Sequence, residues 1–555
     1  MTAENHRGKS FRRLRIFALN VALVLISISI ILLGGETYIR FSEIAGLEKW
    51  LILKKKRDNV QFIETFMRPA DDKTPVRMVS QSIPLKKSPA TFRVFCFGGS
   101  SVFGYPFAPK VSIPIVLRMF LQKVMPARKV EVFNAEFNGG DSSRTLSLMK
   151  EALEFNPDLF IVYTGHNEFL WIDYLHDFDL ITGFHPSTPL TFLMKIRMTL
   201  RKTYLWRWAI GTDLGRKWVQ KWESFRFGHS GMQSGRQSVE FLNATFASFK
   251  ANLLEMVYLA KSRSIPFLLS TVAANHRTLK PLYPTFFKLS EPDLGRFKDL
   301  ILKISSHIEN QQEEIALKLV AEARKIFPNE PYLSFLKSQA LLNTGRVKEA
   351  KNAIENAILN DGYRHRAPKR INEIIREVAA EREIILSDVE KELEALSPYG
   401  IIGDEWIIDH AHPNLEGIIL IAKELIRSLY QAGIVKVGDA NALSYDDIRR
   451  AINLSPSEWR TTTMRLALSE YEHGNVQGAS RHFLKASRPF FSGDKVPEAM
   501  SLYLNGLAVL LRGDKTLARQ NIEEARDIDA LLVEDLNKKF AQLKIAQFLG
   551  KKQIK

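Results

Sequence analysis

The sequence predicts an α/β protein built on a parallel sheet with helices on both faces, to which an N-terminal transmembrane helix and α-helical repeats are added. Short β-rich runs alternate with helical stretches from Phe92 onward, an apolar segment stands near the N-terminus, and a small-large-small pattern recurs at a spacing of 34 residues. Strands that alternate with helices are typical of a parallel sheet covered on both faces.

Length and composition indicate a globular protein of about three or four units. The 555 residues are 45% hydrophobic and 25% charged, which argues against wholesale disorder. The net charge of +17 suits nucleic acid, an anionic membrane or an acidic polymer as partner. Nucleic-acid binding is not expected, because the sequence has no zinc-finger spacing and no RNA-binding aromatic motif. Cys96 is the only cysteine, so no intramolecular disulfide can form, and we expect a buried, inert thiol.

Residues 16–34 are expected to anchor the chain in a membrane. The run Ile16–Leu33 is apolar except for three polar residues, and is just long enough to cross a hydrocarbon core of about 30 Å as a helix. The preceding tail, residues 1–15, is basic and should stay cytoplasmic. No small-x-small cleavage site follows, so an uncleaved anchor is favoured over a signal peptide. A second basic run at 54–57 lies on the far side, but the nearer flank usually dominates. We therefore expect the part of the chain after the anchor to lie in the periplasm or on the outer face of the cytoplasmic membrane.

The α/β domain is expected over residues 91–430, after a connecting segment at 35–90. Its strands are predicted at five places: Phe92–Phe97, Lys129–Asn134, Asp158–Thr164, Ile265–Thr271 and Glu383–Leu386. Ligands of parallel sheets bind at the carboxyl ends of the strands, and the candidate residues below stand at such ends.

An insertion at residues 170–240 contains five of the eight tryptophans, interleaved with arginine and lysine. Amphipathic helices over the mouth of an active site, or helices at a membrane interface, have this composition. An ordinary packed insertion is the alternative, and the sequence leaves the choice open.

A helical repeat is predicted twice, as an insertion at 311–362 and as the C-terminal part of the chain at 441–555. The small-large-small pattern stands in four copies: Ala316, Val320, Ala323; Ala350, Ile354, Ala357; Ala479, Phe483, Ala486; and Ala518, Ile522, Ala525. Such spacing lets two antiparallel helices approach closely, and the displacement of 34 residues between the first two copies is the period of tetratricopeptide repeats.

Three strand ends carry candidates for hydroxyl chemistry. Serine needs a base within hydrogen-bond reach and donors aimed at the oxyanion. Ser100 follows the first strand after two glycines, which permit a tight turn. Gly139 follows the second strand and Asn167 the third, and a backbone N–H and a side-chain amide there could hold an oxyanion. Taken singly, each residue could equally be a helix cap, a turn glycine or a loop cap.

Asp409 and His412 form a fourth candidate group near the end of the α/β domain. With two residues between them, one turn of loop or helix brings both side chains to the same side. A carboxylate beside an imidazole fixes its tautomer and stabilises the cation formed when it accepts a proton. Metal binding or a satisfied surface pair is the alternative for Asp409 and His412, and His410 together with His412 could also suggest a metal site. We find no convincing third ligand, so neither a metal nor a cofactor is expected.

Together the four groups resemble the SGNH (GDSL-like) serine hydrolases, whose members carry Ser, Gly, Asn and His in this order. The resemblance spans about residues 90–430 with two long insertions, and it implies a flavodoxin-like sheet. It also implies site residues: Ser100 as nucleophile, His412 as general base, Asp409 orienting His412, and an oxyanion hole of the Ser100 and Gly139 backbone N–H groups and the Asn167 side chain.

The chain departs from the commonest pattern of that family at two positions. Gly99 stands where aspartate usually precedes the serine, and Glu168 follows Asn167 where aspartate is usual. Two further stretches, 269–276 and 370–376, resemble bacterial SGNH proteins that combine a membrane anchor with tetratricopeptide repeats.

The resemblance implies an enzyme that hydrolyses or transfers an ester-linked acyl group through an acyl-enzyme on Ser100. An esterase, a lipase or a carbohydrate O-acetyl esterase would fit, with a lipid, an acylated glycan or a small ester as substrate. A membrane-bound tetratricopeptide scaffold for protein partners, with an inactive or subsidiary hydrolase domain, is the alternative. Every catalytic position is filled, which favours an active enzyme in which the repeats add protein binding.

Overall fold

The computed structural model describes a large part of the chain: Gly34 and residues 51–56, 59–64, 81–84, 86–108, 110–135, 139–169, 239–281, 291–362, 364, 366–436, 443–472 and 475–543. Among these residues, no helix has the length and apolar character that a membrane crossing requires. The predicted anchor at 16–34, apart from Gly34, lies outside the described residues. So does the aromatic and basic insertion at 170–240, apart from its last two residues.

The α/β domain is built on a five-stranded parallel sheet with the strand order β5-β4-β6-β7-β8. Each strand overlaps one of the five predicted runs: β4 (Thr91–Gly98), β5 (Lys129–Asn134), β6 (Leu159–Tyr163), β7 (Phe267–Ser270) and β8 (Ile385–Ser387). Every residue of β4 and β6 is buried, as expected for central strands covered on both faces. The predicted parallel sheet is confirmed.

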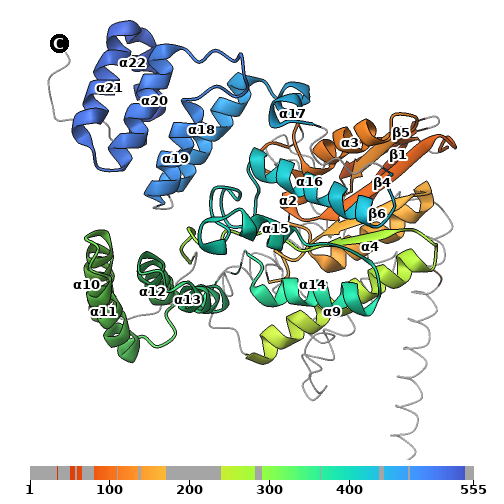
Figure 1. Cartoon of the computed structure of the whole chain (residues 1–555), viewed down its shortest axis with the longest axis horizontal. Coiled ribbons are helices and arrows are strands. Elements are labelled where there is room, and N and C mark those ends of the chain that lie inside the picture. Colours follow the sequence, from red (N-terminus) through yellow and green to blue (C-terminus); the bar gives the residue numbers. More distant parts are fainter. Residues whose placement is uncertain are drawn as a thin grey trace, which may run out of the picture.

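Helices cover both faces of this sheet (Figure 1). On one face lie α3 (Ile113–Val124) and α16 (Leu415–Gln431), which pack against each other. On the other lie α4 (Ser142–Ala152), α9 (Val239–Lys261) and α14 (Lys369–Glu381). Each presents apolar residues to the sheet at helical spacing, as α14 does with Ile371, Ile375 and Val378. The short helices α2 (Ser100–Phe103) and α15 (Val389–Ala395) complete the domain.

A second sheet precedes the α/β domain, where the sequence suggested only a connecting segment. Its strands β1 (Leu51–Lys56), β2 (Asn59–Glu64) and β3 (Ser82–Pro84) are antiparallel in the order β1-β2-β3. The Gln81 side chain exchanges two hydrogen bonds with the backbone of Asn134, at 2.8 and 2.9 Å, and so ties this sheet to the end of β5.

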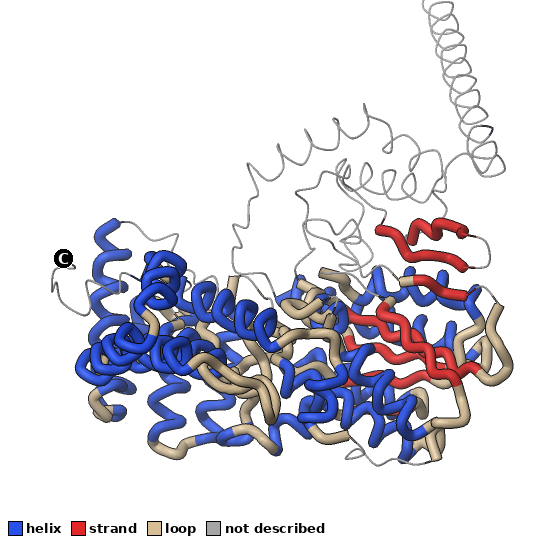
Figure 2. Tube along the Cα trace, turned by 90° about the horizontal axis from the view of Figure 1, so that it is seen from above, coloured by secondary structure: helices blue, strands red, loops and turns tan. Residues whose placement is uncertain are grey.

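Two helical units lie beside the α/β domain. The insert unit comprises α10 (Glu291–Glu309), α11 (Glu313–Ile326), α12 (Pro331–Asn343) and α13 (Val347–Asn360). After α17 (Tyr445–Ala451), the C-terminal unit comprises α18 (Pro456–Glu472), α19 (Val476–Ala486), α20 (Glu498–Leu511), α21 (Lys515–Ile528) and α22 (Ala530–Lys539). Figure 2 shows the strands gathered at one end of the molecule and these helical units at the other.

The small-large-small residues form the contacts within these units. All twelve are at most 4% exposed, and consecutive helices pack side by side. Each unit has apolar clusters of its own, separate from the core around the sheet. The C-terminal unit also reaches that core, because Trp459 and Phe490 stack at 5.0 Å and belong to it. The helical hairpins are therefore present, while the assignment to tetratricopeptide repeats stays a prediction.

Candidate active site

Ser100 stands at the start of α2, directly beyond the carboxyl end of β4, and is 8% exposed. The turn before it has no room for side chains. A Cβ at Gly98 would overlap the carbonyl oxygen of Tyr163, and one at Gly99 would overlap the Asn167 amide nitrogen and lie 3.0 Å from the Gly140 oxygen. The glycine that departs from the family pattern thus lets the second and third strand-end loops approach the serine.

Two hydrogen bonds in series join Ser100 to His412 and Asp409. His412 Nε2 lies 2.6 Å from Ser100 Oγ, and His412 Nδ1 lies 2.6 Å from Asp409 Oδ2, although 312 residues separate the serine from the histidine in sequence. The other carboxylate oxygen of Asp409 accepts backbone N–H bonds from Ala411 and His412, at 3.1 and 3.0 Å. A carboxylate on Nδ1 assigns the proton to that nitrogen and leaves Nε2 able to accept the serine proton.

The candidate catalytic loop, residues Gly403–Asn414, folds back on itself to hold this geometry. Ile408 N–H donates to the carbonyl of His412 at 2.7 Å, and Asn414 N–H donates to that of Trp406 at 2.9 Å. The Asn414 side chain caps α16 by accepting from the Gly417 N–H at 2.8 Å. The residues that carry Asp409 and His412 are therefore fixed to the start of a long buried helix.

Ser101 makes a contact at the candidate site that the sequence did not predict. Its hydroxyl donates to the carbonyl oxygen of Ala411 at 2.8 Å, which joins α2 directly to the loop that carries Asp409 and His412. The one signal in the sequence was its position beside Ser100.

The predicted oxyanion residues lie around the same turn. Asn167 Nδ2 donates to the Gly140 carbonyl at 2.7 Å. Because an amide nitrogen carries two hydrogens, this bond commits one of them and orients the other. Gly139 immediately precedes Gly140 and takes a left-handed backbone conformation with φ 87°. The loops after β5 and β6 thus meet beside the Gly99–Ser100 peptide.

Glu168, the second departure from the family pattern, fastens these two loops together. Its carboxyl group accepts from the backbone N–H of Ser142 at 2.9 Å and lies 2.7 Å from the Ser142 hydroxyl, at the first turn of α4. Burial, reinforced by the charge of Asp141, raises the pKa of Glu168 to about 8. The position of Asn167 therefore depends on a buried carboxyl group one residue away.

Electrostatics favour an ionised Asp409 and neutral His410 and His166. Burial alone would raise the pKa of Asp409, but the His410 and His412 imidazoles and the hydrogen bonds from His412 lower it well below its usual value. Burial lowers the pKa of His410 to about 4, and that of His166 well below its usual value. Among the described residues, only His412 of these three both contacts the serine and pairs with the carboxylate.

Asp409, His410 and His412 also offer ligand atoms within 4.8 Å of one another, so the structure supplies the third ligand that the sequence did not suggest. Both ring nitrogens of His412 are engaged, by Ser100 and by Asp409. A metal ion bound through His412 would have to displace one of these partners. The arrangement suits proton transfer better than metal ligation.

Tyr105 borders the site on its exposed side. Its ring centroid lies 4.6 Å from that of His412, and its side chain is 41% exposed, whereas His412 is 7% exposed. No local sequence pattern indicates this contact, which depends on how the chain turns after α2. Tyr105 is the candidate for contact with a bound substrate.

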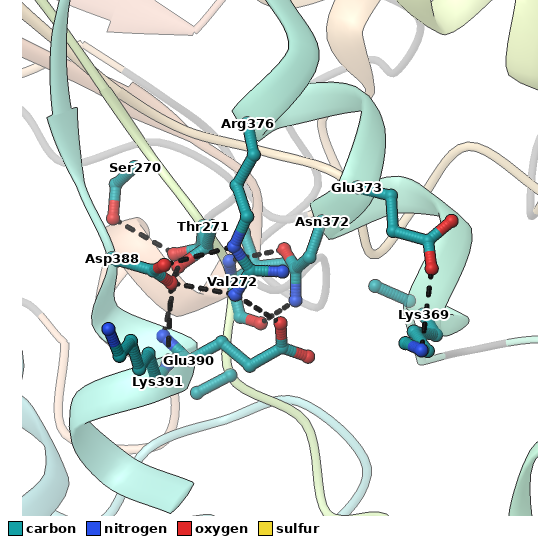
Figure 3. Close-up of polar contacts among 12 residues, drawn as sticks. Ser270, Thr271, Val272, Lys369, Asn372, Glu373, Arg376, Asp388, Glu390 and Lys391 are labelled. Carbon is teal, nitrogen blue, oxygen red and sulfur yellow. Dashed lines mark hydrogen bonds and ion pairs between the residues drawn. The ribbon is translucent and has the colours of Figure 1, made fainter. Parts of the chain in front are cut away.

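The two stretches that resemble anchored SGNH proteins pack against each other rather than on Ser100. The Asn372 side chain bonds both the N–H and the carbonyl of Val272 at 2.8 Å. Figure 3 shows Arg376 reaching from α14 to Asp388, at 2.9 and 2.7 Å, and to Glu390, at 2.7 Å. These contacts hold the segment that follows β7. That segment in turn contacts the catalytic loop, because the Asn275 N–H donates to the His410 carbonyl at 3.1 Å.

No protein-family model matches the sequence, and no curated protein matches it. Among solved structures, the chain is similar to a protein of Parabacteroides merdae described as a GDSL-like lipase, at 10% identity and a TM-score of 0.27. This likeness covers 61% of this chain and 94% of that one. A TM-score this low carries no argument. Membership of the SGNH family therefore stays a hypothesis from the sequence motifs, and the tetratricopeptide resemblance has no support from these comparisons.

Proposed function

We propose that the chain is a serine hydrolase that cleaves or transfers an ester-linked acyl group. Ser100 is the nucleophile, His412 the general base and Asp409 the residue that orients His412. The observation that carries the proposal is the series of two 2.6 Å hydrogen bonds from Ser100 through His412 to Asp409. A serine hydroxyl is a poor nucleophile by itself, and this arrangement supplies the base and the orienting group that it needs.

In the proposed reaction, Ser100 Oγ attacks the ester carbonyl and its proton passes to His412 Nε2. The oxyanion of the tetrahedral intermediate is bound by the backbone N–H groups of Ser100 and Gly139 and by the Asn167 amide. The intermediate collapses as the C–O bond to the leaving alcohol breaks, and His412 returns the proton to that alcohol. Water or a second hydroxyl then attacks the acyl carbonyl while His412 Nε2 takes its proton. The bond from the carbonyl carbon to Ser100 Oγ breaks, His412 returns the proton to Ser100, and an acid or a new ester leaves.

The substrate class and the cellular setting of the proposal come from the sequence. We propose an esterase, lipase or carbohydrate O-acetyl esterase held at the membrane through residues 16–34, acting outside the cytoplasm. The substrate would be a lipid, an acylated glycan or a small ester, and the helical units would bind protein partners.

The test is covalent labelling with a fluorophosphonate probe together with a hydrolysis screen on acetylated sugars and short acyl esters. We expect the wild-type protein to be labelled and active, and Ser100→Ala to lose both properties. Ser262→Ala is the matched control, because the hydroxyl of Ser262 only donates to the Leu259 carbonyl at the exposed end of α9. Absence of labelling in the folded wild type, with reference hydrolases labelled, would exclude the nucleophile and favour the scaffold alternative.

A further inference from the structure

The insert unit reaches the catalytic loop through Arg277, in the segment after β7. Gln339 on α12 donates from Nε2 to the Arg277 carbonyl at 3.0 Å. The guanidinium of Arg277 forms an ion pair with Glu405 and donates from Nε to the Ile401 carbonyl at 3.2 Å. Arg277 also donates its backbone N–H to the Ile402 carbonyl at 3.0 Å, so this one residue contacts the loop and the two residues before it at three points.

The C-terminal unit reaches the same loop from another direction. Arg481 on α19 forms an ion pair with Asp404, whose side chain is 7% exposed. Burial lowers the pKa of Arg481 to about 10, which leaves the guanidinium charged at neutral pH. The next residue of α19, His482, is buried. Helix α19 therefore lies beside the first part of the catalytic loop, where Asp404 stands.

The two contacts converge on neighbouring residues, Asp404 and Glu405. Both stand in the first part of the catalytic loop, a few residues before Asp409. Space there is fully used, since a Cβ at Gly403 would lie 2.5 Å from Arg277 Nη2 and 2.8 Å from the Glu405 carboxylate. Removing the arginine from either pair leaves a carboxylate without its cation, and the Asp404 and Glu405 side chains are only 7% and 24% exposed, so we expect the loop to rearrange locally. A rearrangement at residues 404–405 would move Asp409 as well, because only three residues separate Glu405 from Asp409.

We propose that Arg277 and Arg481 are positioning residues, through which the two helical units together hold the catalytic loop so that Asp409 and His412 face Ser100. This inference rests on the proposed function. It assigns the helical units a role in the chemistry of the site, in addition to any partner they bind. Full activity then requires the C-terminal unit to be docked on the α/β domain through the Arg481–Asp404 pair.

The test compares full-length Arg481→Gln, Arg277→Gln and Asp404→Asn with the wild type, by the rate of fluorophosphonate labelling and by kcat and KM for an ester. A misplacement of about 1 Å costs on the order of 10²-fold, so we expect labelling and kcat to fall at least about tenfold with KM little changed. Arg481→Lys keeps the charge and should recover part of the loss. The dependence of kcat/KM on pH should also shift, because the Asp409–His412 bond sets the basicity of the imidazole.

Lys110→Gln is the matched control, because it removes an exposed ion pair between the C-terminal unit and the α/β domain, Lys110 with Glu458 at 2.5 Å, away from the catalytic loop. Lys110→Gln should leave the labelling rate, kcat and KM unchanged. Wild-type labelling rates in folded Arg481→Gln and Arg277→Gln would overturn the inference. The inference would also be overturned if, in every variant, the loss of activity were fully explained by the fraction of protein that is unfolded. A wild type that never labels would instead refute the proposed function.

Discussion

Replacing Gly99 by alanine probes the oxyanion side of the proposed site with a single methyl group. Gly99 has φ −75°, which any residue can adopt, so the backbone itself accepts the change. The new Cβ would overlap Asn167 Nδ2, well inside the 3.4 Å at which ordinary contact begins. The amide must therefore move by about 1 Å, and a displacement of that size costs on the order of 10²-fold in rate.

The expected result is a loss of about 10²-fold in kcat for Gly99→Ala, and of roughly 10²–10³ for Asn167→Ala, which removes the donor altogether. The double variant should be no slower than Asn167→Ala, because both changes act through one amide and their effects are then not additive. Steady-state ester hydrolysis measures all three. Gly295→Ala is the control: no atom lies within 4 Å of its added Cβ on exposed α10, so activity should be retained.

Wild-type kcat in Gly99→Ala, or additive losses in the double variant, would refute this reasoning. The first result would mean that the amide of Asn167 does not act as an oxyanion donor. The second would mean that the methyl group acts on another part of the site. A destabilisation of about 1–3 kcal/mol from overpacking is expected in either case, so thermal unfolding must be measured alongside the rates.

Three further outcomes follow from the site geometry. Asp409→Asn should lower kcat by about 10⁴-fold, because the amide no longer fixes the proton on His412 Nδ1, and single-turnover acylation measures it. Tyr105→Ala should raise KM more than it lowers kcat, whereas Tyr105→Phe should retain both, as measured by saturation kinetics; equal values for Ala and wild type would exclude substrate contact. Glu168→Gln should flatten the pH dependence of stability. Since the folded-state pKa of Glu168 is raised to about 8, the folded protein holds a proton that the unfolded chain releases near pH 4.5. Its contribution to the free energy of unfolding therefore falls as pH rises from about 4.5 to about 8, by at most about 1.4 kcal/mol per pH unit. Urea unfolding at several pH values measures this slope, and an unchanged slope in Glu168→Gln would contradict the burial argument.

The sequence was informative wherever local pattern decides structure. The strands β4 and β6 are buried on both faces, so each reads as an almost continuous apolar run. The candidate residues stand at strand ends because the chain must turn there, and the turn glycines and polar side chains are visible in the sequence. The helical hairpins were found for a similar reason, since close helix packing requires small residues such as Ala316 and Ala350 at fixed spacing.

The sequence was uninformative where contacts join distant segments. Ser101 and Ala411 are 310 residues apart, and no local pattern links them. Arg481 and Asp404 are of types that usually stand on solvated surfaces, so their pairing appears only once α19 is seen beside the catalytic loop. The sheet β1-β2-β3 was missed because its first strand reads as a short apolar run followed by lysines, without the alternation of a half-buried strand.

The insert unit lies between β7 and α14 in the sequence, and parts of the candidate site stand on both sides of it. The base of the insert is tied across its own ends. Arg366, which leads into α14, donates to the carbonyls of Asn275 and Leu279 at 2.7 Å, and His276 Nε2 lies 3.1 Å from the Ala367 carbonyl. The chain therefore leaves the sheet and returns to it through residues that are hydrogen-bonded to one another. Because these bonds close the loop at its base, the conformational entropy of the inserted residues has little effect on the geometry of the site. That same cluster supports Asn275, whose N–H bonds His410, and Arg277, which binds Glu405. The residues at the base of the insert unit thus also support the catalytic loop. Removing the insert unit should therefore disturb Asp409 and His412 more than the loss of an ordinary surface insertion would.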